Sequence, residues 1–197
     1  MSFGSTGSAD DTPFDGDGLR LQYIKTIAAL DAAEFENNSK AYLKYLSAEP
    51  SKKLASFRYD WFLRLHYEMF GEVWDWAGKL RRTHKTIGLP PEHVPMRLGE
   101  LELNIEAWDR SDPIRDAAII HHTAVFIHPF ENGNGRWARL LANIWLKQAG
   151  FDLVSWPDAN LKDGVHPMRA RYIACLRAAD KCDFEPLIAL HKEYARP

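Results

Sequence analysis

The feature that most constrains the fold is a segment over residues 113–127 that is apolar on almost every side. It begins with Asp112 and Pro113, the order of residue types that suits an N-cap and the first position of a helix. A helix that is apolar around nearly its whole circumference must be enclosed by other elements. The segment therefore predicts a central helix inside a globule that is built mainly of helices.

Helical spacing of apolar residues recurs along most of the chain. One or two helices are expected within Leu19–Leu46, and glycines such as Gly71 and Gly150 stand where helices are expected to stop. Lys79–Pro95 differs, because it is basic and polar and contains several glycine and proline residues, so a hairpin or a loop is expected there. The other predicted helices span Leu54–Phe70, Met96–Trp108, Arg136–Ala149, Met168–Lys181 and Pro186–Tyr194.

Size and charge restrict the class of protein. The 197 residues suit one domain with a full core, expected over residues 19–197, and residues 1–18 are rich in Gly, Ser and Asp, which predicts a mobile tail. A net charge of −2 argues against a nucleic-acid or anionic-membrane partner. The chain has no apolar run of membrane-spanning length and no signal-peptide pattern, so we expect a cytoplasmic protein. Its two cysteines, Cys175 and Cys182, are expected to be reduced thiols.

The residues from His128 to Arg139 suit phosphate chemistry. They read His-Pro-Phe-Glu-Asn-Gly-Asn-Gly-Arg-Trp-Ala-Arg. The glycines allow a positive φ and a close approach to a ligand, and they stand before a helical pattern, where free amides and the macrodipole favour an anion. Arg136 and Arg139 share one helix face, and arginines at this end of a helix need an anion or a carboxylate to compensate them. The sequence therefore predicts a phosphate site beside a histidine.

This segment resembles the core motif of Fic (Fic/DOC) proteins, usually written His-x-Phe-x-Asp/Glu-Gly-Asn-Gly-Arg-x-x-Arg. All of its fixed residues are present at matching spacing except the acidic one, which Asn132 replaces. The likeness extends over about residues 26–190 and is greatest to the small bacterial group called mobile mystery protein B, which also tends to carry Asn there. It implies an all-α Fic-type helical domain with one short β-hairpin flap near residues 80–90.

The resemblance also implies a reaction, the transfer of AMP from ATP to a hydroxyl side chain of a target protein. His128 would be the catalytic base, a role that an ordinary histidine pKa of about 6.5 suits near neutral pH. Two alternatives stay open, the transfer of another phosphate-containing group and a nucleotide-binding module without turnover. The residues that would bind the nucleotide phosphates are Gly133, Asn134, Gly135, Arg136 and Arg139.

The departure at the acidic position bears on Mg²⁺, which that residue binds in most relatives. An asparagine offers one neutral oxygen to a hard cation where a carboxylate offers charge. Asn132 and the neighbouring Glu131 are therefore weak candidate ligands, and the ATP phosphates would supply most of the others. His121 and His122 lie on the central helix without the spacing of a zinc site, so a structural role is expected for both.

Two regulatory or docking elements are also implied by the resemblance. In the family, an edge strand of the flap holds the target segment by β-augmentation. Many relatives, some of them toxin-like, are held inactive by a glutamate against the second motif arginine, here Arg139, or by a separate antitoxin. Glu34 and Glu36 are the candidates for self-inhibition, and a solvated helix glutamate is an equal alternative for each. The docking residues would be Thr83, His84, Lys85, Thr86, Ile87 and Gly88, for which an ordinary surface hairpin is the alternative.

Overall fold

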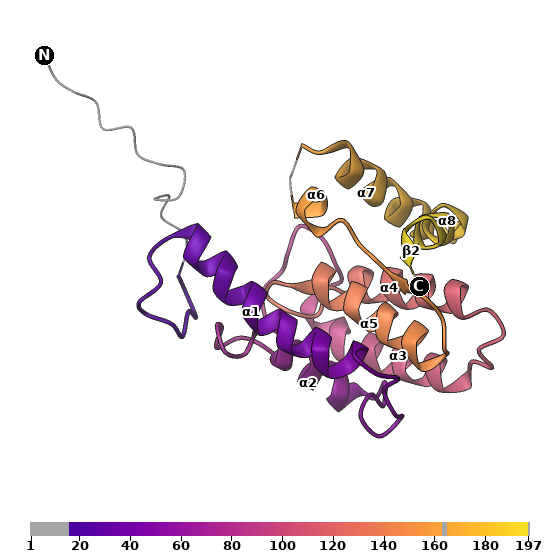
Figure 1. Ribbon diagram of the computed structural model, residues 1–197, viewed down its shortest axis with the longest axis horizontal. Helices are drawn as coiled ribbons and strands as arrows, with labels where there is room; N and C mark the ends of the chain where they lie inside the picture. The colour runs from indigo at the N-terminus through magenta and orange to yellow at the C-terminus, as the bar shows by residue number, and fades with distance from the viewer. Residues whose placement is uncertain (1–15, 163–164, 197) are drawn as a thin grey trace, which may run out of the picture.

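A computed structural model describes residues 16–162 and 165–196, so most of the predicted tail lies outside the described residues. Within the described part, helices dominate and the strands form a single two-stranded sheet, which confirms the predicted all-α class. Helices α4 (Pro113–Ile127) and α5 (Asn134–Gln148) pack together in the middle (Figure 1). On α4, Ala117, Ile120 and Ala124 are fully enclosed, as its apolar circumference predicts.

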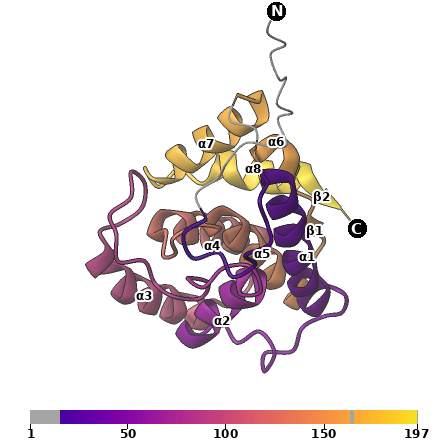
Figure 2. The same ribbon diagram turned by 90° about the vertical axis from the view of Figure 1, so that its left-hand side faces the viewer.

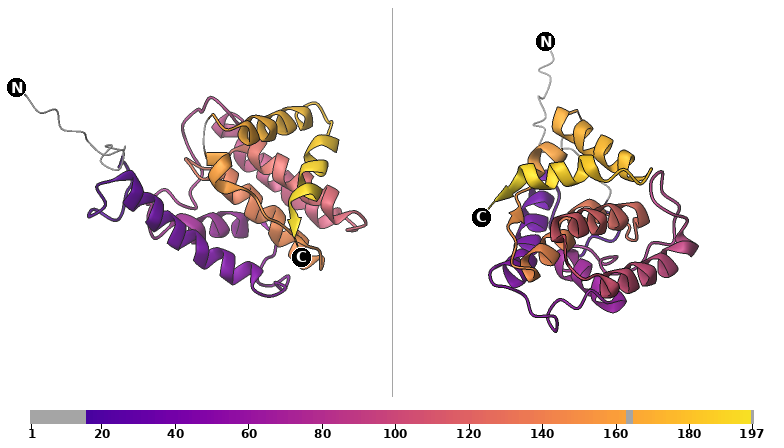
Figure 3. Two further views of the ribbon diagram at one scale, coloured as in Figure 1. Left: turned by 45° about the horizontal axis from the view of Figure 1, so that its top comes forward. Right: turned by 90° about the vertical axis from the view of Figure 1, so that its right-hand side faces the viewer.

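Two helix pairs enclose this centre. Helix α1 (Ile27–Leu46) packs on α2 (Tyr59–Phe70) and also contacts α5, while α7 (Pro167–Ala179) packs on α8 (Glu185–Tyr194), which contacts α4. Figure 2 shows α2 and the α7–α8 pair on opposite sides of the centre, and Figure 3 shows the α7–α8 pair over the same side of α4 from two further directions. The 3₁₀ turn η2 (Pro91–His93) leads into α3 (Val94–Ala107), which runs beside α4. No helix in the described residues is long and apolar enough to cross a lipid bilayer.

Aromatic side chains hold the motif helix α5 in place. Trp137 and Trp145 of α5 are fully enclosed, and Trp137 meets Phe62 of α2 edge-on with 6.1 Å between ring centroids. Burying a large side chain of this kind contributes roughly 1.5–3 kcal/mol. Several such contacts along one helix make α5 a rigid support for the loop that precedes it.

Helix boundaries differ from the sequence prediction where tertiary packing intervenes. The helix expected from Leu54 begins only at Tyr59, because Phe57 takes a left-handed φ of 55° and places its ring against Trp61 and Trp145. The region from Leu19 to Leu46 forms one helix rather than two. It begins after Thr26, whose hydroxyl accepts the amide of Ala29.

The hairpin predicted near residues 80–90 is wrong. Residues 81–90 form an irregular loop, and the described sheet pairs β1 (Leu153–Val154) with β2 (Ala195–Arg196) in antiparallel register. The guanidinium of Arg81 occupies the carbonyls of Thr83 and Leu89, which a hairpin ladder would need. The short helix α6 (Asp158–Lys162) was not predicted.

Candidate active site

The motif loop is a tight connection between the two central helices. Helix α4 ends at His128, which takes a left-handed conformation with φ 51° and ψ 59°. The side chain of Asn134 then closes the loop, because its Oδ1 accepts the Phe130 amide and its Nδ2 donates to the Phe130 carbonyl, both at 2.9 Å. Both polar atoms of this side chain are thus engaged within the loop, and the expected contact of Asn134 with phosphate stays a prediction.

Gly133 begins the motif helix at a position that only glycine fits. Its φ is 77°, and a Cβ there would lie 2.6 Å from the ring of Phe70. As the N-cap it offers no side chain to the first turn, and within the described residues no hydrogen bond engages the amides of residues 134–136. Free amides at the positive end of a helix favour an anion, and the phosphate site predicted from the sequence stays a prediction.

His66 of α2 packs against the motif loop and supports it. Sequence reasoning missed this residue. Its ring is fully buried and stacks on Phe130, with 3.6 Å between centroids and 14° between planes. Its Nδ1 accepts the Gly78 amide, so its Nε2 carries the proton and donates to the Asn132 carbonyl at 3.0 Å. Burial lowers the pKa of His66 to about 3, so the ring is neutral. One histidine on an apolar helix face gave no signal of this role.

His128 carries a half-buried imidazole at the junction of the loop and the helix. Burial is the main cause that lowers its pKa, and the charges of Arg81 and Lys85 lower it further, while the main-chain carbonyl of Val125 opposes them. Its Nδ1 is buried without a hydrogen bond of good geometry among the described residues. A neutral, incompletely solvated imidazole can accept a proton, which agrees with the predicted role of a base.

Arg136 pairs with a carboxylate from the first helix. Its Nη1 lies 2.6 Å from Oε2 of Glu34, and its guanidinium lies over the ring of Phe70 at 4.6 Å. The second oxygen of Glu34 accepts the indole N–H of Trp74 at 2.6 Å, and only 8% of Glu34 is exposed. Glu34 thus meets the first motif arginine, which corrects the expectation that an inhibitory glutamate meets Arg139.

Arg139 points to a different carboxylate. It is buried, and its Nη2 lies 2.7 Å from Oδ1 of Asp158 on α6. In this structure the two motif arginines thus pair with carboxylates on α1 and α6. The prediction that both can bind one phosphate ligand stays a prediction. Sequence reasoning missed Asp158, because it lies in a short helix that no periodicity announces.

His121 of the central helix belongs to a buried hydrogen-bond network, and the neighbouring His122 contacts an exposed carboxylate. His121 lies 3.1 Å from Nε2 of His191 and 2.9 Å from the hydroxyl of Tyr172, and His122 lies 2.9 Å from Asp180. Burial first, and then the charges of His191 and Arg139, hold the pKa of His121 well below its ordinary value. These contacts agree with the structural role expected from the sequence.

The predicted magnesium ligands are engaged elsewhere. The carboxylate of Glu131 lies 2.5 Å from Nζ of Lys85 and accepts the hydroxyl of Thr83, while Oδ1 of Asn132 accepts the amide of Gly133. The described residues contain no group of three His, Cys, Asp or Glu side chains that could hold a metal ion. The weak candidacy of Glu131 and Asn132 as magnesium ligands therefore stays a prediction.

The docking segment is exposed, and its main-chain amides are not engaged by other described residues. Residues 83–88 are exposed, and 58% of Ile87 is accessible. Within the described residues, no main-chain hydrogen bond engages the amides of residues 82–88. The segment is a loop rather than a strand, yet its amides remain available to another chain.

Glu36, the second candidate for inhibition, lies away from the motif. Its side chain is 76% exposed and lies 3.6 Å from Nζ of Lys40, one turn further along α1. It thus has the solvated position that was the alternative for both glutamates.

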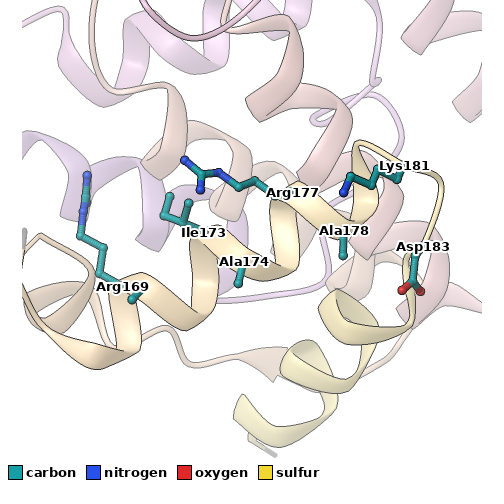
Figure 4. A pocket seen from close by; sticks show the side chains of 8 residues that line it. Arg169, Ile173, Ala174, Arg177, Ala178, Lys181 and Asp183 are labelled. Carbon is teal, nitrogen blue, oxygen red and sulfur yellow. The ribbon is translucent and has the colours of Figure 1, made fainter.

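A surface hollow of about 640 Å³ lies on α7. Figure 4 shows Arg169, Arg177 and Lys181 along its length, with Asp183 on the turn that follows. No motif residue lines it, so it plays no part in the site described above.

The chain is similar to known proteins in its family, its sequence and its fold. Residues 56–146 match the model of the Fic/DOC family. The chain is 31% identical over 204 residues to protein adenylyltransferase fic-1 of Caenorhabditis briggsae, covering 98% of this chain and 37% of that protein. It is also 31% identical over 198 residues to protein adenylyltransferase Fic of Drosophila grimshawi, covering 95% and 37%. The chain thus spans just over a third of the length of these curated relatives.

Solved structures give the same likeness. A structure of Fic-1 residues 134–508 from C. elegans has a TM-score of 0.66 and 25% identity, covering 90% of this chain and 52% of that one. The Bartonella tribocorum effector BepC with bound AMPPNP has a TM-score of 0.68 and covers 93% and 98% of the two chains. At 18% identity, the second match shows a shared fold.

Proposed function

Because the chain belongs to the Fic/DOC family, whose model matches residues 56–146, we propose that it is a protein adenylyltransferase. It transfers AMP from ATP to a hydroxyl side chain of a target protein. The observation that carries the proposal is the half-buried His128 at the end of α4, directly before the uncapped start of α5. A proton acceptor and an anion site on one rigid loop are what attack on a phosphate requires.

In this reaction the target hydroxyl attacks the α-phosphorus of ATP. His128 accepts the hydroxyl proton as the new oxygen–phosphorus bond forms, and the bond to pyrophosphate breaks. The amides of residues 134–136 stabilise the charge that develops on the α-phosphate oxygens. At rest, Glu34 engages the guanidinium of Arg136, and Asp158 engages that of Arg139. Each arginine must therefore leave its carboxylate before it binds an outer phosphate of ATP.

The transferred group is tested with ATP labelled at either phosphate. The protein is incubated with a bacterial lysate and with α-labelled or γ-labelled ATP, and modified proteins are read by intact mass. Label from the α-position alone supports AMP transfer. Label from the γ-position alone supports phosphoryl transfer, and no transfer with measurable ATP binding supports a module without turnover.

The matched variant is His128→Ala. A general base contributes roughly 100-fold to 10,000-fold, so transfer should fall by at least the lower factor while ATP binding stays nearly unchanged. A parallel loss of ATP binding and transfer would instead assign His128 a structural role.

In this proposal, Mg²⁺ would bind together with the nucleotide. Glu131 and Asn132 are engaged with Lys85 and Gly133, so the ATP phosphates and water would supply most of the ligands of the cation. Bound there, the cation would neutralise phosphate charge.

The target protein is proposed to dock on the segment Thr83–Gly88. The unengaged amides of this segment can pair with an extended chain, which reads main chain rather than sequence. Exposed Ile87 offers an apolar contact beside them.

Glu34 is proposed to inhibit the resting protein. Its carboxylate holds Arg136 at 2.6 Å and is fixed on its other side by Trp74. A phosphate that needs this guanidinium must displace a buried carboxylate, so ATP binds less well while the pair is intact. A separate antitoxin would become the better explanation if removal of Glu34 changed nothing.

A further inference from the structure

Arg81 is a buried guanidinium that binds only main-chain carbonyls. It is 4% exposed, and the ion pairs of the described residues include none with it. Its Nε donates to the carbonyl of His128 at 2.6 Å, its Nη1 donates to that of Thr83 at 2.7 Å, and its Nη2 donates to that of Leu89. A planar fork with several donors suits such a set of acceptors, and the single ammonium of a lysine does not.

The three acceptors join two functional parts of the molecule. Thr83 begins the docking segment and Leu89 directly follows it, while the His128 carbonyl belongs to the helix end that carries the proposed base. Carbonyls at the end of a helix lack partners within the helix, so this contact also satisfies the main chain there. The amide of Arg81 adds a main-chain bond to the Pro129 carbonyl at 3.0 Å.

Gly88 shows how closely the segment lies against the base. It takes a φ of +90°, and a Cβ at this position would overlap the Cβ of His128 and approach Nη2 of Arg81 to 3.3 Å. The main chain of the segment therefore touches the side chain of His128 with no room for another group.

We propose that Arg81 is a positioning residue of the transfer reaction. By binding the carbonyls of Thr83, Leu89 and His128 together, it holds segment 83–89 against His128. A target hydroxyl that docks on the segment is thereby presented to the imidazole at a fixed distance. This inference rests on the adenylyltransferase proposed above. It adds a residue that acts through His128 and the docking segment.

The charge of Arg81 has a second effect on the same base. Burial first, and then Arg81 and Lys85, lower the pKa of His128 and so favour the neutral imidazole that accepts a proton. Glu131 pairs with Lys85, while Arg81 has no carboxylate partner among the described residues. Loss of the Arg81 charge should therefore raise this pKa and move the acidic limb of the pH–rate profile upward.

The test compares Arg81→Gln, Arg81→Lys and the exposed control Arg82→Gln. Steady-state kinetics give kcat, KM and the pH profile, calorimetry gives the ATP Kd, and the rate of trypsin cleavage after Lys85 reports how firmly residues 83–89 are held. In Arg81→Gln, kcat should fall at least tenfold with the ATP Kd within twofold, faster cleavage after Lys85 and a raised acidic limb. Arg81→Lys should lower kcat and leave the limb in place, because the charge is kept and the fork is lost. Arg82→Gln should match the wild type.

Two outcomes overturn the proposal. One is wild-type kcat in a folded Arg81→Gln protein, and the other is an unchanged rate of cleavage after Lys85 in that variant. If Arg81→Gln does not fold, Gly88→Ala disturbs the same contact from the exposed side, and wild-type kcat in that variant overturns the proposal equally. If the wild type transfers nothing, the proposed function fails, yet the cleavage comparison still decides whether Arg81 holds the segment.

Discussion

Replacement of Glu34 by glycine should lower stability and raise activity at once. Glu34 lies between Arg136 and Trp74 at 2.6 Å from each, whereas Glu36, two residues along the same helix, is 76% exposed. Glycine costs both positions about 1 kcal/mol of helix propensity. Glu36→Gly therefore serves as the matched control, and the difference between the two variants isolates the buried contacts.

The magnitude follows from the two contacts. An indole N–H left without a partner costs about 1–3 kcal/mol. The side chain of Arg136 is 34% exposed, so the loss of its ion pair counts for only about 1 kcal/mol after solvent screening. Glu34→Gly should then be roughly 2–4 kcal/mol less stable than Glu36→Gly, or roughly 4–16 °C lower in Tm for a chain of this size.

Arg136, which loses its ion pair in Glu34→Gly, should then bind ATP more tightly and support faster transfer. If the pair competes with phosphate by about 1.4 kcal/mol, its loss raises ATP affinity and transfer by about tenfold. Saturating ATP should also restore more of the lost Tm in Glu34→Gly than in the control, because ligand binding stabilises the folded state.

The assay measures Tm with and without ATP, the ATP Kd and the transfer rate for both variants. A purely structural glutamate would lose stability and activity together. ATP affinity and transfer in Glu34→Gly that stay within twofold of Glu36→Gly would refute the inhibitory role.

Three further predictions follow from the site. Asn132→Asp adds a carboxylate beside the motif and should lower the Mg²⁺ concentration for half-maximal transfer; an unchanged Mg²⁺ dependence would show that this side chain does not reach the cation. The lowered pKa of His128 means that kcat/KM should rise with pH through an inflection below the ordinary 6.5 and then level off, and an inflection at or above that value would contradict the buried base. His66, whose folded pKa is about 3, is neutral in the folded protein and takes up a proton on unfolding below pH 6.5. The free energy of unfolding should therefore fall by about 1–2 kcal/mol per pH unit from 6.5 toward 3, and urea titrations of wild type and His66→Gln should show a shallower dependence in the variant.

Local patterns were sufficient for the central helices and the loop between them. Asp112 caps α4 through the Arg115 amide at 3.1 Å, as its position before Pro113 indicates. The helix end at His128 and the positive φ of Gly133 follow from residue types within a few positions. Such features depend on neighbours in the sequence, so they can be read without the fold.

Contacts between residues far apart in the sequence decided which partner each site residue binds. Glu34 and Arg136 are 102 positions apart, and nothing local distinguishes Glu34 from Glu36 until α1 packs against α2 and α5. Arg81 and His128 are 47 positions apart, and the loop that their hydrogen bond holds stands where a hairpin was predicted.

The sequence by itself therefore determined the main helices and the chemical groups that the motif loop carries. The tertiary structure alone decided which partner each charge meets, that His66 supports the loop, and that the docking segment is a loop rather than a strand. The physical reason is that capping and periodicity act within one or two helical turns. Ion pairs and buried hydrogen bonds depend instead on which distant helices pack together, and one sequence does not encode that choice in any local pattern.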